Sequence, residues 1–221
     1  MKKVFSIFAA FILLFSFAAC SNNTNGEEPS LSAPQTGNTD PNVSEGSNTN
    51  PSDPQTEPAE TNSNSLVVYF SWSGNTEKVA SAIQSQTQAD IFELVPEAPY
   101  SEDYDTVVDL AQEEQRENAR PAISGSIENI AQYDVIYVGF PNWWGDMPMI
   151  LYTFFDSYDL SGKTIAPFCT SGGSGLSNTV NEIKELEPNA TVTDGLHIGS
   201  SSASNPDDTV SEWLNDIGLA K

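Results

Sequence analysis

Six consecutive residues could hold an anion: Ser71-Trp72-Ser73-Gly74-Asn75-Thr76. Ser71, Ser73 and Thr76 carry hydroxyl donors, and Gly74 lets the backbone come close to a ligand. A helical pattern starts at Asn75, and the first turn of a helix has unpaired N–H groups with positive partial charge. The segment therefore predicts an anion site of the kind that suits a phosphate.

The same segment lacks the features of two common phosphate-binding loops. It has neither the Gly-Lys-Ser/Thr ending of nucleoside-triphosphatases nor the Gly-x-Gly-x-x-Gly pattern of dinucleotide-binding proteins. Its only nearby cation is Lys78. A phosphate held mainly by neutral donors indicates a monophosphate bound without a metal. The alternative interpretation is an ordinary capped helix after a strand, which is a common arrangement.

Two further loops have compositions that suit a flat ligand. One is Pro141-Asn142-Trp143-Trp144-Gly145, and the other begins Thr170-Ser171-Gly172-Gly173 and continues to residue 175. Two adjacent indoles near solvent favour stacking on a planar molecule, although they could also cover the core or meet a partner protein. A phosphate loop beside aromatic walls fits flavin mononucleotide (FMN), with its phosphate in the first loop and its ring system against the other two.

The sequence contains few residues that could form other kinds of site, such as a metal centre or a set of catalytic side chains. His197 is the only histidine, so neither a histidine-based metal site nor a Ser-His-Asp set is expected, and a structural role is predicted for it. Cys169 ends an apolar stretch and is interpreted as a small buried hydrophobe.

Five apolar strands separated by helices must position these loops. Strands are predicted at 66–70, 90–95, 135–140, 164–169 and 193–198, and helices from 75, over 105–118, over 148–157, from 176, and after 205. This alternation is typical of an α/β fold with a parallel sheet covered on both faces. In such sheets ligands bind beyond the carboxyl ends of the strands, which is where all three loops fall.

The sequence resembles the flavodoxin family at these loops. Residues 71–76 match its Thr/Ser-x-Thr/Ser-Gly-Asn-Thr phosphate loop, and the likeness continues through residues 141–145 and 167–175. It is most similar to a branch from anaerobic and gut bacteria, in which a Tyr-Ser/Thr-x-x-Tyr element, here Tyr100 to Tyr104, follows the second strand. The resemblance spans residues 65–221 and implies a flavodoxin-like three-layer α/β sandwich with five parallel strands in the order 2-1-3-4-5.

The resemblance also implies which residues bind FMN. The phosphate would be held by Ser71, Ser73, Asn75 and Thr76 and by the backbone of Trp72 and Gly74. The ring would contact residues 141–145 and 170–173. The redox chemistry is then the cofactor's, and no catalytic side chain is predicted.

The first part of the chain has a different character. Residues 1–19 have a basic start and an apolar run that ends in small residues, as in an export signal. Phe17-Ala18-Ala19-Cys20 resembles a bacterial lipoprotein cleavage box, in which Cys20 would become the lipid-bearing N-terminus; the alternative is a plain secretory signal. Residues 20–64 are polar, acidic and almost free of apolar residues, which predicts a disordered tether. The expected location is the outer face of the bacterial membrane.

The domain at residues 65–221 carries 24 acidic and six basic residues, a formal charge of −18. Such a surface disfavours nucleic acid, favours a basic redox partner and keeps a monomer in solution. Our first hypothesis is an electron carrier that exchanges electrons with a protein or a small molecule. The second is an FMN-dependent NAD(P)H or quinone reductase. The third is a binding module that has lost its flavin.

Overall fold

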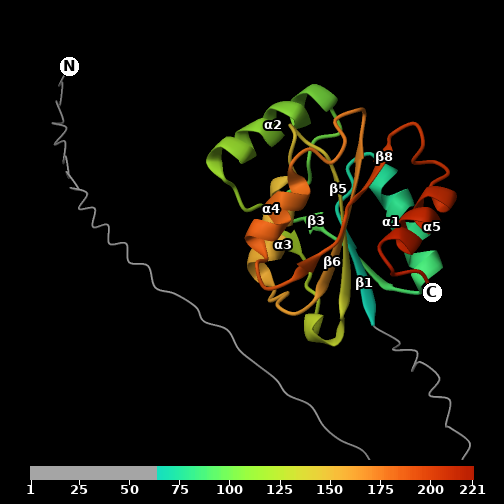
Figure 1. Cartoon of the computed structure of the whole chain (residues 1–221). Coiled ribbons are helices and arrows are strands. Elements are labelled where there is room, and N and C mark those ends of the chain that lie inside the picture. Colours follow the sequence, from blue (N-terminus) through green and yellow to red (C-terminus); the bar gives the residue numbers. More distant parts are fainter. Residues whose placement is uncertain (1–63) are drawn as a thin grey trace, which may run out of the picture. The chain divides into compact units, whose positions relative to one another are not determined.

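The computed structural model describes residues 64–221, which form a parallel sheet between two layers of helices (Figure 1). The predicted export signal, Cys20 and all of the predicted tether but its last residue lie outside the described residues. Between residues 64 and 221 no helix combines the length and the apolar character that crossing a bilayer requires.

The sheet confirms the predicted strand order. Strand β1 (Ser65–Tyr69) lies between β2 (Asp90–Glu93) and β5 (Val135–Pro141), and β5 pairs with β6 (Thr164–Ser171). Along the outer side of β6 lie β7 (Thr191–Val192) and β8 (Leu196–Gly199). Every pair in this sheet is parallel, so β2, β1, β5, β6 and the β7–β8 pair correspond to the order 2-1-3-4-5.

The second predicted strand is shorter than expected. The parallel pairing ends at Glu93, and Val95–Pro96 (β3) instead pairs antiparallel with Ile123–Ser124 (β4). Pro96 has no N–H to donate, so it cannot continue a ladder in the main sheet.

The sequence predicts the last strand at 193–198, but only 196–198 of that range lie in a strand, and a separate short strand, β7, precedes it. Between β7 and β8 the chain leaves the ladder at Asp194 and Gly195, where the Asp194 carbonyl accepts a hydrogen bond from the Trp213 indole at 3.0 Å. Gly195 packs so closely under Leu176 that a Cβ would meet its side chain at 3.0 Å.

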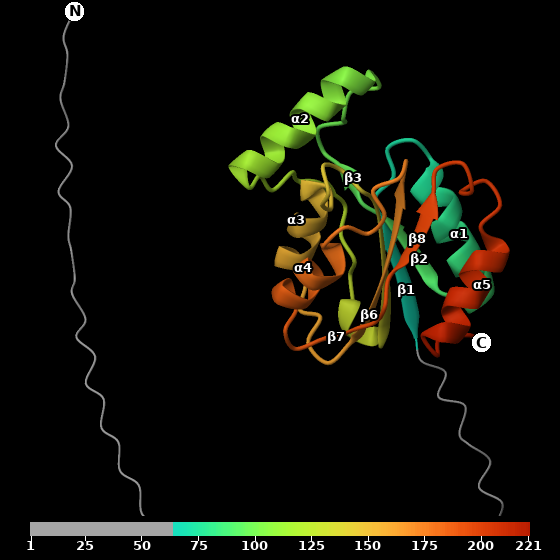
Figure 2. The same ribbon diagram turned by 45° about the horizontal axis from the view of Figure 1, so that its top comes forward.

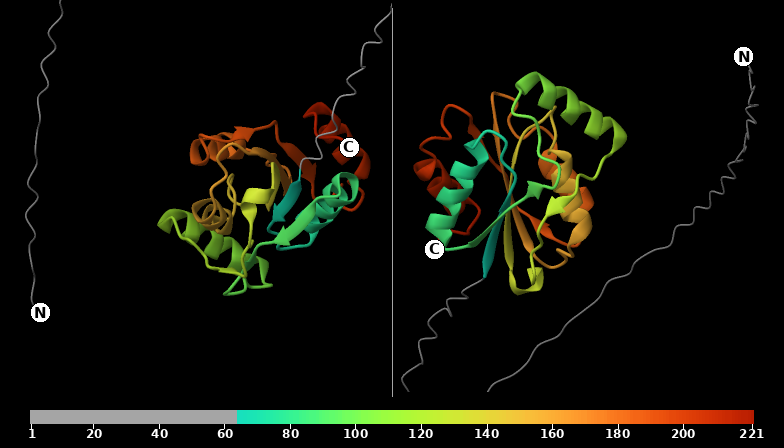
Figure 3. Two further views of the ribbon diagram at one scale, coloured as in Figure 1. Left: turned by 90° about the horizontal axis from the view of Figure 1, so that it is seen from below. Right: turned by 180° about the vertical axis from the view of Figure 1, so that it is seen from behind.

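Of the five α-helices in residues 64–221, four cover the two faces of the sheet, and one lies farther out (Figure 2). One face carries α1 (Asn75–Thr87) and α5 (Asp207–Asp216), and the other carries α3 (Met149–Ser157) and α4 (Thr179–Leu186). Helix α2 (Tyr104–Glu117) extends beyond the α3–α4 layer near the carboxyl ends of the strands, as the view from behind also shows (Figure 3, right). A short 3₁₀ turn, η1 (Ile130–Gln132), precedes β5.

Strand β1 shows why the sheet is buried on both sides. Leu66 and Val68 belong to one core cluster, and Val67 and Tyr69 belong to the other. Because successive side chains of a strand point to opposite faces, a continuous apolar run serves two cores. The burial predicted for this strand is confirmed, since all five of its residues are buried.

Gly139 of β5 is a test of packing at the centre of the sheet. It lies opposite Phe168 of β6, and a Cβ at residue 139 would overlap the Phe168 ring. We expect Gly139→Ala to lower the free energy of unfolding by about 1–3 kcal/mol, because a filled core cannot absorb the methyl group without moving the ring. Chemical denaturation measures the change. Gly199→Ala is the control, since nothing lies within 4 Å of a Cβ there; equal losses in the two variants would contradict this packing.

Candidate functional site

The 71–76 loop leaves the carboxyl end of β1 and turns directly into α1. Gly74 precedes the helix with φ 78°, in the left-handed region that glycine adopts without strain, and no side chain caps the helix start. The first N–H groups of α1 therefore point out of the loop without a partner in the helix. This geometry disagrees with the alternative of an ordinary side-chain-capped helix.

The Ser71 hydroxyl in this loop, like the first N–H groups of α1, is a donor without a hydrogen-bond partner. Within residues 64–221 only two buried side-chain polar atoms lack a hydrogen-bond partner, Ser71 Oγ and Ser65 Oγ at the other end of β1. Buried polar groups are nearly always paired, so each exception calls for an explanation. An anion at the start of α1 would supply the Ser71 hydroxyl with an acceptor, and the donor set therefore fits a phosphate.

The charges near the loop agree with a site made of neutral donors. Lys78 is exposed in the first turn of α1, next to the acidic Glu77. The Glu77 carboxylate lies near Gly74, since a Cβ on that glycine would be 3.8 Å from its Oε2. Burial, with a smaller contribution from Glu77, raises the pKa of the nearby Glu93. Amide and hydroxyl donors, rather than a cation, must offset the charge of a bound phosphate.

The three sequence-predicted loops come together at one edge of the sheet. Thr76 Oγ1 and Thr170 Oγ1 are hydrogen-bonded at 2.9 Å, which ties the first loop to the third. The Asn142 N–H donates to the Thr170 carbonyl at 2.9 Å, which ties the second loop to the third. Thr170 thus connects all three.

A cavity of about 720 Å³ opens beside these loops. Of the predicted binding residues, Trp72, Gly172, Gly173 and 142–145 line it, whereas Ser71, Ser73–Thr76, Pro141, Thr170 and Ser171 do not. The phosphate-type loop and the cavity are therefore neighbouring parts of one site, joined at Trp72. The role of each residue toward a ligand stays a prediction.

Helix α2 forms the opposite wall of the cavity, which the sequence did not predict. Its contributions are Tyr104, Val107, Val108 and Ala111. In the sequence, Tyr104, Val108 and Ala111 are spaced four and three residues apart, which places them on one face of a helix. This spacing does not indicate that the face packs against the second loop, which contains Trp143 and Trp144, rather than against the sheet.

The two adjacent tryptophans have different environments. Trp143 is half-buried and packs edge-on against Phe70 and Tyr100, with ring centroids 5.4 and 5.2 Å apart, so it covers the core and also lines the cavity. Trp144 is 55% exposed and has φ 54°, which is unusual for a residue with a side chain. Its indole Nε1 donates to the Val108 carbonyl of α2 at 3.0 Å.

Further hydrogen bonds hold α2 and its preceding loop to the site. The Trp72 indole donates to the Ser101 carbonyl at 2.9 Å, and Gln115 Nε2 donates to the Trp143 carbonyl at 2.8 Å. The Tyr100 hydroxyl donates to Glu114 Oε2 at 2.9 Å, and burial raises the pKa of both groups. Indole and amide donors therefore fix the distance between the two walls of the cavity.

The third loop is shaped by its own polar groups. Ser171 Oγ accepts from the N–H groups of Gly173 and Gly175 and bonds to His197 Nε2 at 2.9 Å. This is the structural role predicted for His197. The Cys169 thiol donates to the Gly175 carbonyl at 3.2 Å, and burial raises its pKa to about 12, which keeps it protonated.

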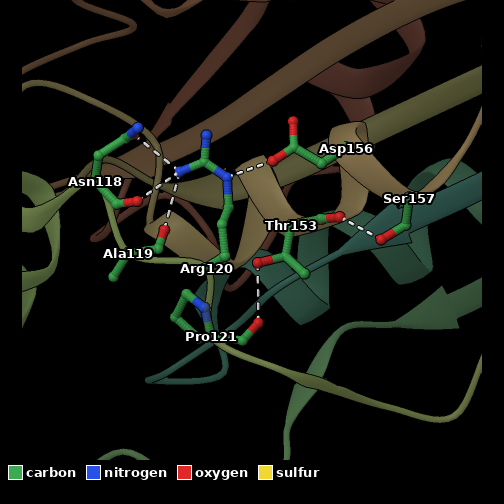
Figure 4. Close-up of polar contacts among 7 residues, drawn as sticks. All are labelled: Asn118, Ala119, Arg120, Pro121, Thr153, Asp156 and Ser157. Atoms are coloured by element: carbon green, nitrogen blue, oxygen red, sulfur yellow. Dashed lines mark hydrogen bonds and ion pairs between the residues drawn. The ribbon is translucent and has the colours of Figure 1, made fainter.

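The far end of α2 is anchored by Arg120 (Figure 4). Its guanidinium donates to the carbonyls of Asn118 and Ala119, to the Asn118 side chain, and to Asp156 of α3 at 2.5 Å. It also lies over the Tyr152 ring, 5.2 Å from the centroid, and the Tyr152 hydroxyl donates at 2.8 Å to Asp146, which directly follows the second loop. Arg120 therefore links the end of α2 to the second loop.

A doubly covered parallel sheet with an anion loop after its first strand is the architecture of a flavodoxin-like protein. The sequence model of the flavodoxin family matches residues 64–217, and the chain belongs to that family. No curated protein matches the chain in sequence.

Solved structures give the same assignment. A protein of Bacteroides eggerthii, described as a candidate flavoprotein, is 32% identical over 71% of this chain and 98% of its own, with a TM-score of 0.64. A similar protein of Bacteroides uniformis is 30% identical over 69% and 98%, with a TM-score of 0.61. A flavoprotein of Lactobacillus acidophilus, solved in complex with FMN, is 27% identical over 66% and 99%, with a TM-score of 0.54.

The Arg120 anchor leads to a prediction about α2. We expect Arg120→Ala to make the amides of α2 exchange with solvent roughly fivefold faster, since a partly exposed cluster of charged hydrogen bonds is worth about 1 kcal/mol. Hydrogen–deuterium exchange measures this. Arg116→Ala is the matched control, because Arg116 makes only an exposed 3.9 Å ion pair with Glu113. Unchanged exchange in Arg120→Ala would mean that α2 is held by its apolar face and its bonds to the tryptophans, without the Arg120 cluster.

Proposed function

We propose that this protein binds FMN at the three loops and carries electrons on the outer face of the bacterial membrane. The observation that carries the cofactor assignment is the unpaired Ser71 hydroxyl beside the uncapped start of α1. The Lactobacillus acidophilus flavoprotein, whose structure contains FMN, supports it. FMN supplies one- and two-electron redox chemistry, and the protein binds and orients it.

The chain's own residues divide into two tasks. Ser71, Ser73 and the backbone N–H groups at the start of α1 hold the phosphate, with Thr76 tying this loop to the third loop. Trp72, Trp143 and Trp144 bound the space for the ring system, and residues 172–173 approach it without side chains. None of the residues that line the cavity is charged, so a neutral aromatic ring is favoured there.

Electron transfer is the function best matched to this site. The described part of the chain offers no group of three or more His, Cys, Asp or Glu residues that could hold a metal ion, and the Cys169 thiol is buried and protonated. The partner is a basic redox protein or a small molecule, since a domain of charge −18 attracts cations and repels anions. The protein acts as a monomer in this proposal.

A reductase is the second candidate, and the size of the cavity favours it. It would pass electrons from a nicotinamide nucleotide or a quinol to a small acceptor. Rapid mixing of the FMN-loaded protein with NADH separates the two candidates: fast bleaching of the flavin supports a nicotinamide-dependent reductase, and none supports the carrier.

The phosphate site is tested by a pair of serine variants. We expect Ser71→Ala to weaken FMN binding by about 1–3 kcal/mol, roughly five- to 150-fold in Kd, because a charged ligand loses a buried donor. Quenching of flavin fluorescence measures the affinity. Ser65→Ala removes the other unpaired buried hydroxyl, at the opposite end of β1, and should leave affinity unchanged.

Riboflavin, which lacks the phosphate, provides the second control. Its affinity should be the same in wild type and Ser71→Ala. If FMN bound equally well to all three proteins, the phosphate would not lie at this loop.

The membrane location is tested on the full chain in a bacterial host. We expect the wild type to incorporate a labelled fatty acid and to sediment with membranes, and Cys20→Ser to lose the label and the tight attachment, because acyl chains contribute about 0.8 kcal/mol per buried CH₂. Fractionation and fatty-acid labelling measure both properties. An unlabelled wild-type protein found in the medium would favour the plain secretory signal instead.

A further inference from the structure

The cavity is chemically unlike the surface around it. All of its lining side chains are uncharged, and α2 contributes Tyr104, Val107, Val108 and Ala111 to its wall. Yet the domain has 24 acidic residues, and Asp103, Asp105 and Asp109 lie on or next to the same helix. An uncharged cavity inside a strongly acidic domain selects ligands by shape and apolar contact and disfavours anions.

None of the basic residues of the described domain lines this cavity. Arg116 pairs with Glu113, Arg120 pairs with Asp156, and Lys163 is buried against the carbonyls of Tyr133 and Ala131. A nicotinamide nucleotide carries at least two phosphate charges and would find no cation here.

The cavity also has room for more than one ring system. Its volume of about 720 Å³ falls in the upper half of the usual range for small-molecule sites. Of the 71–76 loop only Trp72 lines it, so only the ring end of FMN needs to enter. Trp144, 55% exposed, and Tyr104, 66% exposed, present aromatic rings to a molecule that arrives from solvent. Flat aromatic surfaces of this kind favour stacking with a second planar molecule.

We propose that the wall formed by Val108, Ala111, Tyr104 and Trp144 binds a neutral quinone, stacked between α2 and the ring of FMN. This inference rests on the proposed FMN function and names the small molecule that exchanges electrons with it. Reduced FMN gives two electrons and two protons to the quinone. The products are oxidised FMN and hydroquinone, and no third reactant is needed. Lipid-tailed and soluble quinones share this ring chemistry.

Binding is tested without any turnover. Menadione, a neutral quinone, and a naphthoquinone sulfonate, its negatively charged counterpart, are titrated calorimetrically into the fully oxidised FMN-loaded protein. We expect menadione to bind about tenfold more tightly or better, since the sulfonate would lie in an uncharged cavity of an acidic domain. A quinone with a short isoprenoid tail forms a third arm: tighter binding than menadione points to a membrane quinone, and equal binding points to a soluble one.

A pair of lysine variants on α2 locates the site. Val108→Lys puts a cation into the cavity wall and should reduce the preference for menadione about tenfold. Leu110→Lys adds the same charge on the same helix, at a residue that is 37% exposed and does not line the cavity, and should leave the preference within about twofold. Retained FMN binding in each variant reports that the domain is folded.

The outcomes separate this inference from the function on which it rests. Wild-type protein that binds FMN but neither quinone overturns the quinone site and leaves the electron carrier intact. Equal affinity for the neutral and the charged quinone, or equal effects of the two lysine variants, also overturns it. Failure of the wild type to bind FMN overturns both proposals.

Discussion

The junction between β1 and α1 is the constraint on which the rest of the site depends. Strand β1 is buried on both faces, so its direction is fixed by two cores at once, and the loop that follows must emerge at one defined point. Gly74 turns the chain into α1 without a capping side chain. The N–H groups and the Ser71 hydroxyl that remain unpaired each cost about 1–3 kcal/mol when shielded from water. A bound anion removes that cost, so ligand binding at this loop should also stabilise the fold.

The sequence predicted the parts of the structure that local chemistry determines. The 71–76 loop, the start of α1 at Asn75 and the convergence of three loops all follow from composition and from the geometry of parallel sheets. The break between Val192 and Leu196 could not be predicted in this way, because it depends on Trp213 and Leu176, which meet Asp194 and Gly195 only in the folded chain. Distant contacts of this kind leave no periodic pattern.

For helix α2, the sequence predicts the helix and its apolar face but not the neighbour against which that face packs. The spacing of Tyr104, Val108 and Ala111 indicates a helix with an apolar face. The neighbour of that face is decided by hydrogen bonds across the chain, such as Gln115 to the Trp143 carbonyl and the Trp144 indole to the Val108 carbonyl. Side chains that were predicted to stack on a ligand therefore also hold the opposite wall. The tryptophans line the cavity and also fix the distance between their loop and α2.

This double role explains how the site can be both apolar and well defined. Apolar contacts are non-directional and would allow α2 to slide, whereas an indole N–H bonded to one carbonyl fixes its position along the helix axis. The Arg120 cluster fixes the other end of α2, and through Tyr152 and Asp146 it is connected to the same loop that carries the tryptophans. The polar anchors of α2 lie outside the cavity or at its rim, and its interior stays free of charge. A cavity built in this way offers a ligand apolar and aromatic contacts but no side-chain charge with which to pair.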